Sequence, residues 1–176
     1  MIKANNKSCI DYGKTILNEM SLSPGFSNWS VELARTGLEG RILEIGCGLG
    51  GNLDCLSSCG EDLWCSDYNE EYISFVSSSK NFMLGKTILW DINDAPKFST
   101  GFDSFYCSNV LEHIEDDQQA ILNISRVPHI KKGVIIVPSN KLIYNRIDKN
   151  LGHYRRYNKR SLRNKLVKGG FKVISI

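Results

Sequence analysis

The segment Arg41 to Asn52 reads RILEIGCGLGGN, and the interpretation of the whole chain starts from it. It begins as a short apolar run that carries one carboxylate, Glu44, and it continues into glycines at positions 46, 48, 50 and 51. Glycine has no Cβ and adopts positive φ, so such a turn lets the backbone approach a ligand, and a following helix points free N–H groups there. The segment predicts a buried strand, a tight turn and a nucleotide-like ligand.

Two cofactor classes fit this spacing. Gly46, Gly48 and Gly51 satisfy the dinucleotide pattern, whereas Glu44 with Gly46, Gly48 and Gly50 satisfies the pattern of S-adenosylmethionine enzymes. A carboxylate at the mouth of the turn repels a pyrophosphate but suits a ligand that carries an ammonium and a sulfonium. Glu44 therefore favours S-adenosylmethionine, while a tight turn without a ligand stays the structural alternative.

Length and composition predict one globular domain. The chain has 176 residues, 41% of them apolar, which is enough for a single core. No apolar run approaches the ~20 residues that span a bilayer, and the N-terminus lacks a signal core, so we expect a cytoplasmic protein. We divide the domain into an N-terminal helical cap (1–40), a cofactor-binding half (41–127) and a substrate-side half (128–176).

The distribution of charge and the spacing of the cysteines limit the kinds of partner and bound metal that the sequence predicts. Between Lys141 and Lys168 ten Lys or Arg residues stand against one acid, Asp148, so this segment carries +9 while the whole chain carries +3. An anionic partner would meet this segment. The six cysteines form no Cys-x-x-Cys pair and have no histidine near any two of them, so the sequence predicts neither a metal site nor a redox site.

Apolar runs and breakers alternate along the chain. We expect strands from residue 41 and at 63–66, 86–90, 102–108, 134–137 and 171–176. Helices are expected at 11–20, 28–36, 52–58, 69–79, from about 117 to 127, and at 161–168. This alternation predicts an α/β fold, a doubly wound, mostly parallel Rossmann-like sheet with helices on both faces.

Three of the expected strands end at an acid: Glu44, Asp67 and Asp91. Because parallel strands end at one sheet edge, these carboxylates should lie close together. Asp67 is placed to accept both hydroxyls of a ribose diol, and Asp91 is placed to accept from an adenine N6. The alternatives are that Asp67 caps the next helix and that Asp91 starts a turn.

Over nearly its whole length the chain resembles the class I S-adenosylmethionine-dependent methyltransferases. The segments that carry the resemblance are LEIGCGLGGN, SDYN, WDIND, FDSFYCSNVLEHIEDD, IDKNLGHYRRYNKRSL and KGGF. NVLEH is more specific than the glycines, and GHYRRY is similar to one branch of bacterial and archaeal members.

The resemblance implies a cofactor site whose parts follow the first four strands. The glycines would lie against methionine and ribose, Asp67 would hold the diol, and Ser108 with Asn109 would face the reacting methyl. The implied site consists of Glu44, Gly46, Cys47, Gly48, Gly50, Asp67, Tyr68, Asp91, Ile92, Ser108 and Asn109.

The substrate side is less specified. His113 and His153 are candidate bases, needed only if the acceptor keeps its proton, and His113 has a local orienting role as its alternative. Two arginines between two tyrosines suit a phosphate or carboxylate, and a solvated basic face is the alternative. The candidate substrate residues are Tyr154, Arg155, Arg156 and Tyr157.

These residues lead us to expect methyl transfer to an oxygen or nitrogen of a small or carrier-bound anionic acceptor. Three alternatives stay open: a non-catalytic S-adenosylmethionine-binding domain, a nucleic-acid methyltransferase and an NAD-dependent oxidoreductase. The nucleic-acid reading is disfavoured because the fourth strand ends in SNVLEH and not in a box that holds a flipped base. The NAD reading is disfavoured by Glu44 and Asp91.

The chain ends before the antiparallel strand that normally completes this fold. Residues 171–176 should then either move in beside the fifth strand or pair with a second copy, since an unpaired apolar edge is a liability. A homodimer through the open sheet edge is therefore one expectation.

Overall fold

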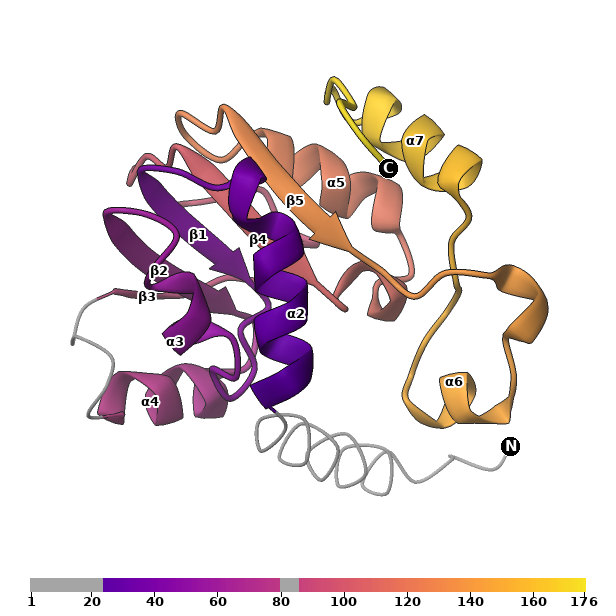
Figure 1. Cartoon of the computed structure of the whole chain (residues 1–176), viewed down its shortest axis with the longest axis horizontal. Coiled ribbons are helices and arrows are strands. Elements are labelled where there is room, and N and C mark those ends of the chain that lie inside the picture. The colour runs from indigo at the N-terminus through magenta and orange to yellow at the C-terminus, as the bar shows by residue number, and fades with distance from the viewer. Residues whose placement is uncertain (1–23, 80–85) are drawn as a thin grey trace.

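The computed structural model of the chain describes residues 24–79 and 86–176 (Figure 1). The strands are β1 (Arg41–Ile45), β2 (Asp62–Asp67), β3 (Thr87–Leu89), β4 (Ser104–Ser108) and β5 (Lys132–Ile136). The α-helices are α2 (Pro24–Ala34), α3 (Leu53–Leu56), α4 (Glu70–Ser78), α5 (Asp117–Ser125), α6 (Arg146–Asn150) and α7 (Lys159–Lys168). Short 3₁₀ helices are η1 (Arg35–Gly37), η2 (Leu111–His113) and η3 (Lys141–Ile143). The expected helix at 11–20 lies outside the described residues.

The five strands form one sheet in the order β3-β2-β1-β4-β5, and every pair is parallel. The predicted Rossmann-like fold is confirmed. Because the chain leaves β1 toward β2 on one side and returns to β4 on the other, the order reverses between β1 and β4. Ligands of such sheets bind outside the carboxyl ends of the strands at this reversal. The turn after β1 and the turn after β4 therefore bound the expected binding crevice.

Helices cover both faces of the sheet, as the sequence predicted (Figure 1). Leu43 and Phe105 belong to a core cluster that includes residues of α5 and α7. Ile42 and Tyr106 belong to a second cluster that includes residues of α2, α3 and α4. Neighbouring residues of one strand face opposite clusters, so the central strands are apolar on both faces and buried, as parallel strands are.

The predicted strand at 171–176 is wrong, since no residue of this segment is in a strand. The Phe171 ring packs on Phe105 with ring centroids 5.7 Å apart, and Phe171 with Val173 contacts the α5–α7 cluster. These side chains hold the segment on the helical layer, so its backbone does not reach the outer edge of β5. The expected move beside β5 is thus contradicted, whereas pairing with a second copy stays a prediction.

Two helix positions also differ from the sequence prediction. Pro24, expected to act as a breaker, begins α2, which suits the fixed φ of proline and its missing N–H. Helix α6 was not predicted; Asn145 caps it, and Asp148 completes a capping box with the Asn145 backbone.

A buried polar contact joins α5 to the segment before α7. Asp117 is 2% exposed and accepts hydrogen bonds or ion pairs from Tyr157 Oη at 2.8 Å, Arg155 Nη1 at 2.8 Å and Lys165 Nζ at 2.6 Å. Tyr157 Oη also lies 3.1 Å from the Leu111 carbonyl. The Asp117 carboxylate therefore ties the 154–157 segment and α7 to the start of α5, and the Tyr157 hydroxyl also contacts η2 after β4.

Tyr157→Phe should lower the free energy of unfolding by about 1–3 kcal/mol, because it leaves a buried carboxylate oxygen without its hydroxyl donor. Urea unfolding measures the change. Tyr154→Phe is the matched control, since the Tyr154 side chain is exposed and should tolerate the same substitution. Equal stability of the two variants would contradict the assigned role of the Tyr157 hydroxyl.

Candidate active site

The turn after β1 has the backbone that its glycines predicted. Gly46, Gly48 and Gly50 have φ of 74°, 53° and 81°, in the left-handed region that favours glycine. The Ser66 carbonyl of β2 accepts the N–H groups of Gly46 at 2.8 Å and of Cys47 at 3.0 Å. The turn is thus fastened to the end of the neighbouring strand, and Cys47 is buried in it.

Asp67 at the end of β2 reinforces this turn. Its Oδ2 accepts the Gly48 N–H at 2.9 Å, and its Oδ1 accepts the Asn69 N–H at 2.9 Å. Burial raises the pKa of Asp67, and these N–H groups oppose the rise. The cap of α4 is Asn69, whose side chain accepts from Glu71 N, so the alternative in which Asp67 caps that helix is wrong.

Glu44 lies in β1 beneath the turn and is only 1% exposed. Its Oε1 accepts a hydrogen bond from Asn52 Nδ2 at 2.9 Å, whereas its Oε2 has no partner in the described part of the chain. Burial raises the pKa of Glu44 to about 7, and the bond from Asn52 offsets only part of this rise. A buried carboxylate with an unused oxygen favours a cationic donor as its partner.

The residues assigned to adenine, which follow β2 and β3, differ in exposure. Asp91 is exposed, and its Oδ1 accepts both the backbone N–H and the side-chain amide of Asn93, each at 2.9 Å, as in the turn that was its alternative reading. Tyr68 is 71% exposed. Ile92 is buried, and its carbonyl accepts from Asn123 Nδ2 of α5 at 2.9 Å.

The segment after β4 meets the glycine turn. Asn109 has φ of 54°, donates its backbone N–H to the Ile136 carbonyl at 2.9 Å, and donates its side-chain amide to Ser108 Oγ at 3.3 Å. A Cβ added to Gly46 would collide with the side chain of Val110. The two turns therefore touch where the strand order reverses.

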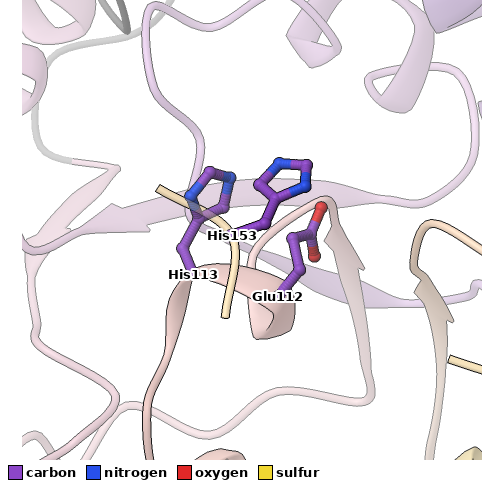
Figure 2. A group of neighbouring side chains, drawn as sticks. All are labelled: Glu112, His113 and His153. Carbon is purple, nitrogen blue, oxygen red and sulfur yellow. The ribbon is translucent and has the colours of Figure 1, made fainter. Parts of the chain in front are cut away.

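Both candidate bases lie together, and a buried acid joins them (Figure 2). The His113 and His153 rings meet edge to face with centroids 4.6 Å apart. Glu112 is fully buried, both of its carboxylate oxygens lack partners in the described residues, and burial raises its pKa to about 7. Burial against the protein removes water from the His113 ring and lowers its pKa, and the neighbouring His153 lowers it further. Part of the His113 residue nevertheless remains exposed to solvent.

Asp148 orients His153. The Asp148 side chain is completely buried, and its Oδ1 lies 3.0 Å from His153 Nδ1 and 2.7 Å from Arg156 Nε. Its Oδ2 accepts the Asn145 N–H at 3.0 Å. Burial raises the pKa of Asp148, but the bonds from Arg156, Asn145 and His153 outweigh it and bring the pKa to about 2. Asp148 is therefore a fixed anion, and it was not among the site residues predicted from the sequence.

The four candidate substrate residues are divided between surface and core. Arg156 is paired with Asp148, and Arg155 is paired with Asp117 and donates to the Glu115 carbonyl at 2.7 Å. Tyr157 is buried, whereas Tyr154 is 52% exposed beside the Arg155 guanidinium, which lies 5.7 Å from its ring centroid. Of the four, Tyr154 is the one whose side chain is largely accessible.

A protein-family model described as a methyltransferase domain matches residues 43–137, more than half of the chain. The chain belongs to this family. Its parallel five-stranded sheet is that of class I S-adenosylmethionine-dependent methyltransferases, and the family implies use of that cofactor. No curated protein matches the sequence significantly.

Three solved structures show the same fold at low sequence identity. The Bacillus subtilis YcgJ protein has a TM-score of 0.62 at 17% identity, covering 81% of this chain and 66% of its own. An S-adenosylmethionine-dependent methyltransferase from Clostridium acetobutylicum has a TM-score of 0.58 at 16% identity, covering 80% and 76%. A chain from the complex of the Haloferax volcanii Trm112 activator with a methyltransferase has a TM-score of 0.68 at 11% identity, covering 97% and 77%.

The chain thus spans 66% of the length of YcgJ. None of the described helices has the length and apolar character that crossing a membrane requires.

The raised pKa of Glu44 makes stability depend on pH in the ligand-free protein. Its folded pKa of about 7 lies above the unfolded value, so its contribution is complete below about pH 4 and is lost as the pH rises to 7. Glu44→Gln mimics the protonated acid. We therefore expect Glu44→Gln to match the wild type at pH 4 and to be more stable than it by roughly 1–3 kcal/mol at pH 7.5.

Urea unfolding at the two pH values measures this difference. Glu61→Gln is the control, because Glu61 is exposed and the substitution should leave the pH profile unchanged. A constant difference between Glu44→Gln and the wild type at both pH values would mean that Glu44 does not titrate as described.

Proposed function

We propose that the protein is an S-adenosylmethionine-dependent methyltransferase that transfers a methyl group to an oxygen or nitrogen of a small or carrier-bound anionic acceptor. The observation that carries this proposal is Glu44, a buried carboxylate with an unpartnered oxygen beneath the glycine turn. It suits the ammonium of the cofactor and opposes a pyrophosphate, so it also separates this function from NAD-dependent chemistry.

The other cofactor residues fit the same ligand. Gly46, Gly48 and Gly50 carry no side chain and hold the left-handed φ of the turn, so its backbone is proposed to lie against methionine and ribose. Each Asp67 oxygen already accepts one N–H, and a carboxylate oxygen has a second lone pair for a ribose hydroxyl. Tyr68 and Asp91 are exposed, as a surface that receives adenine requires, and the Ile92 N–H is assigned to a ring nitrogen by the resemblance.

The bound cofactor supplies an electrophilic methyl on sulfur, so the protein's task is to hold an acceptor near and in line with it. Ser108 and Asn109 stand at the end of β4, where the methionine end is proposed to lie. His153, with Nδ1 bonded to Asp148, has Nε2 left to take a proton from an acceptor that keeps one. His113 is the second candidate for this role.

An anionic acceptor is supported by the basic segment between residues 141 and 168. Arg155, Arg156 and Lys165 are neutralised by buried acids there. Seven exposed cations of the segment pair with no acid of the described residues, and these are Lys141, Arg146, Lys149, Lys159, Arg160, Arg163 and Lys168. An anionic group could pair with these exposed cations, and Tyr154 is exposed on the same segment.

The direct test is calorimetric titration of the protein with S-adenosylhomocysteine and, in parallel, with NADH. The proposal expects S-adenosylhomocysteine to bind more tightly, and tighter binding of NADH would overturn it. Transfer of labelled methyl to a pool of hydroxyl, amine and nucleic-acid acceptors then separates an enzyme from a binding domain. Labelling of nucleic acid alone would replace the small or carrier-bound acceptor by a polynucleotide.

Asp67→Ala should weaken S-adenosylhomocysteine binding by roughly 2–4 kcal/mol, because it removes a charged acceptor of the diol and the anchor of Gly48. Asn69→Ala is the matched control. It removes the cap of α4, which costs about 1 kcal/mol of stability, without touching the proposed ribose site. Calorimetry and urea unfolding on both variants decide the point, and equal affinity losses would refute the role of Asp67.

A further inference from the structure

Glu112, His113 and His153 form a cluster that sequence spacing did not reveal (Figure 2). One ring nitrogen of each histidine and one carboxylate oxygen of Glu112 lie within 4.8 Å of one another. The first two residues come from η2 after β4, and the third follows α6, 40 residues later. We propose that these three side chains bind one divalent transition-metal ion, with Zn²⁺ as the reference ion.

The Glu112 carboxylate is the strongest reason to place a cation here. Its residue is 0% exposed, and neither oxygen has a hydrogen-bond partner among the described residues. A buried charged carboxylate without partners costs several kcal/mol, and proteins offset that cost by keeping the group protonated, by pairing it or by coordinating a metal. In Figure 2 the Glu112 carboxylate points toward His153.

His153 is prepared as a metal ligand by the residue behind it. Its Nδ1 lies 3.0 Å from the buried Asp148 carboxylate, which leaves Nε2 as the nitrogen with a free lone pair. A carboxylate behind an imidazole fixes the tautomer and the ring orientation of metal-binding histidines and raises their basicity. Asp148 would therefore serve as a positioning residue for the ion, and Arg156 holds Asp148 in place.

Two imidazoles and one carboxylate match a known ligand set. This set binds Zn²⁺ in hydrolytic enzymes and Fe²⁺ in oxygenases, in both cases with positions left open for substrate or water. Bonds of about 2.1 Å in a tetrahedral site put ligand atoms about 3.4 Å apart, so the three ligand atoms, which lie within 4.8 Å of one another, need to approach by at most about 1.4 Å. His113 is exposed, which leaves room for further ligands on the solvent side.

The position of the cluster suggests what the ion would do. It lies next to Val110, which packs against Gly46 of the cofactor turn, and it is followed by Tyr154, whose N–H bonds the Glu112 carbonyl at 2.7 Å. An acceptor hydroxyl bound at the open position would lose its proton to water more readily, because a metal ion lowers the pKa of a bound oxygen. With the ion in place His153 and His113 are ligands and not bases, so the ion takes over the role that the two histidines have in its absence. Ion binding stands on the three side chains alone, whereas this role rests on the proposed methyl transfer.

The test measures metal binding by the whole, metal-stripped chain. Equilibrium dialysis against Zn²⁺, with Mg²⁺ in a parallel arm, should give one Zn²⁺ per chain and a preference for Zn²⁺ over Mg²⁺. Co²⁺ should produce the visible absorption of a nitrogen–oxygen site without the near-ultraviolet band of a thiolate. Binding of no Zn²⁺, or a cobalt spectrum dominated by thiolate, would overturn the proposal, because the chain also has free cysteines.

Variants locate the ion. Glu112→Gln and His153→Asn should each weaken Zn²⁺ binding at least tenfold, whereas His129→Asn should leave it unchanged. His129 is a matched control, since it lies outside the cluster and its φ of 63° suits asparagine. Wild-type affinity in Glu112→Gln would overturn the assignment even if His153→Asn failed to fold, and circular dichroism checks folding.

S-Adenosylhomocysteine binding is measured on the same samples. If the wild type did not bind S-adenosylhomocysteine, the proposed function would be contradicted, but the metal site would not. If both cluster variants still bound Zn²⁺, the metal site would be contradicted, but the proposed function would not.

Discussion

The bond between the Asp67 carboxylate and the Gly48 N–H is the contact on which the site depends. It joins the end of β2 to the turn that follows β1, and the Ser66 carbonyl adds two further bonds to the same turn. The turn would otherwise be a run of glycines with high conformational entropy. Once it is fastened, Gly46 meets Val110 after β4, and Glu44 is enclosed beneath the turn.

The features that the sequence predicted correctly are those encoded locally. Alternation of apolar runs with helical segments was enough for a parallel sheet, and glycines at 46, 48 and 50 have the positive φ that their spacing implied. Asp67 ends β2 as expected and lies near enough to Glu44 to influence its charge, whereas the closeness of Asp91 to these two acids stays a prediction. Asp67 bonds the turn and not the helix, because Asn69, two residues later, is the better placed cap.

What the sequence did not predict depends on contacts between distant residues. Phe171 was predicted to lie in a strand, because the residues next to it in the sequence do not indicate that its ring packs on Phe105. The ion pairs of Arg155 with Asp117 and of Arg156 with Asp148 were not predicted, and the role of the two arginines toward an acceptor stays a prediction. The burial of Asp148 could have been predicted from the sequence. It is the one acid in a segment with ten Lys or Arg residues, so neighbouring cations can pair with it and allow it to be buried.

The central claim is that Glu44 receives the cationic end of the cofactor. Titration with S-adenosylhomocysteine at pH 6.5, in two buffers with different ionisation enthalpies, tests it most directly. Glu44, with a pKa of about 7, is largely protonated in the free protein, and an ammonium beside it favours the ionised form. Binding should therefore release a proton in the wild type and release less in Glu44→Gln. Equal proton release by the two proteins, or none by the wild type, would contradict the account.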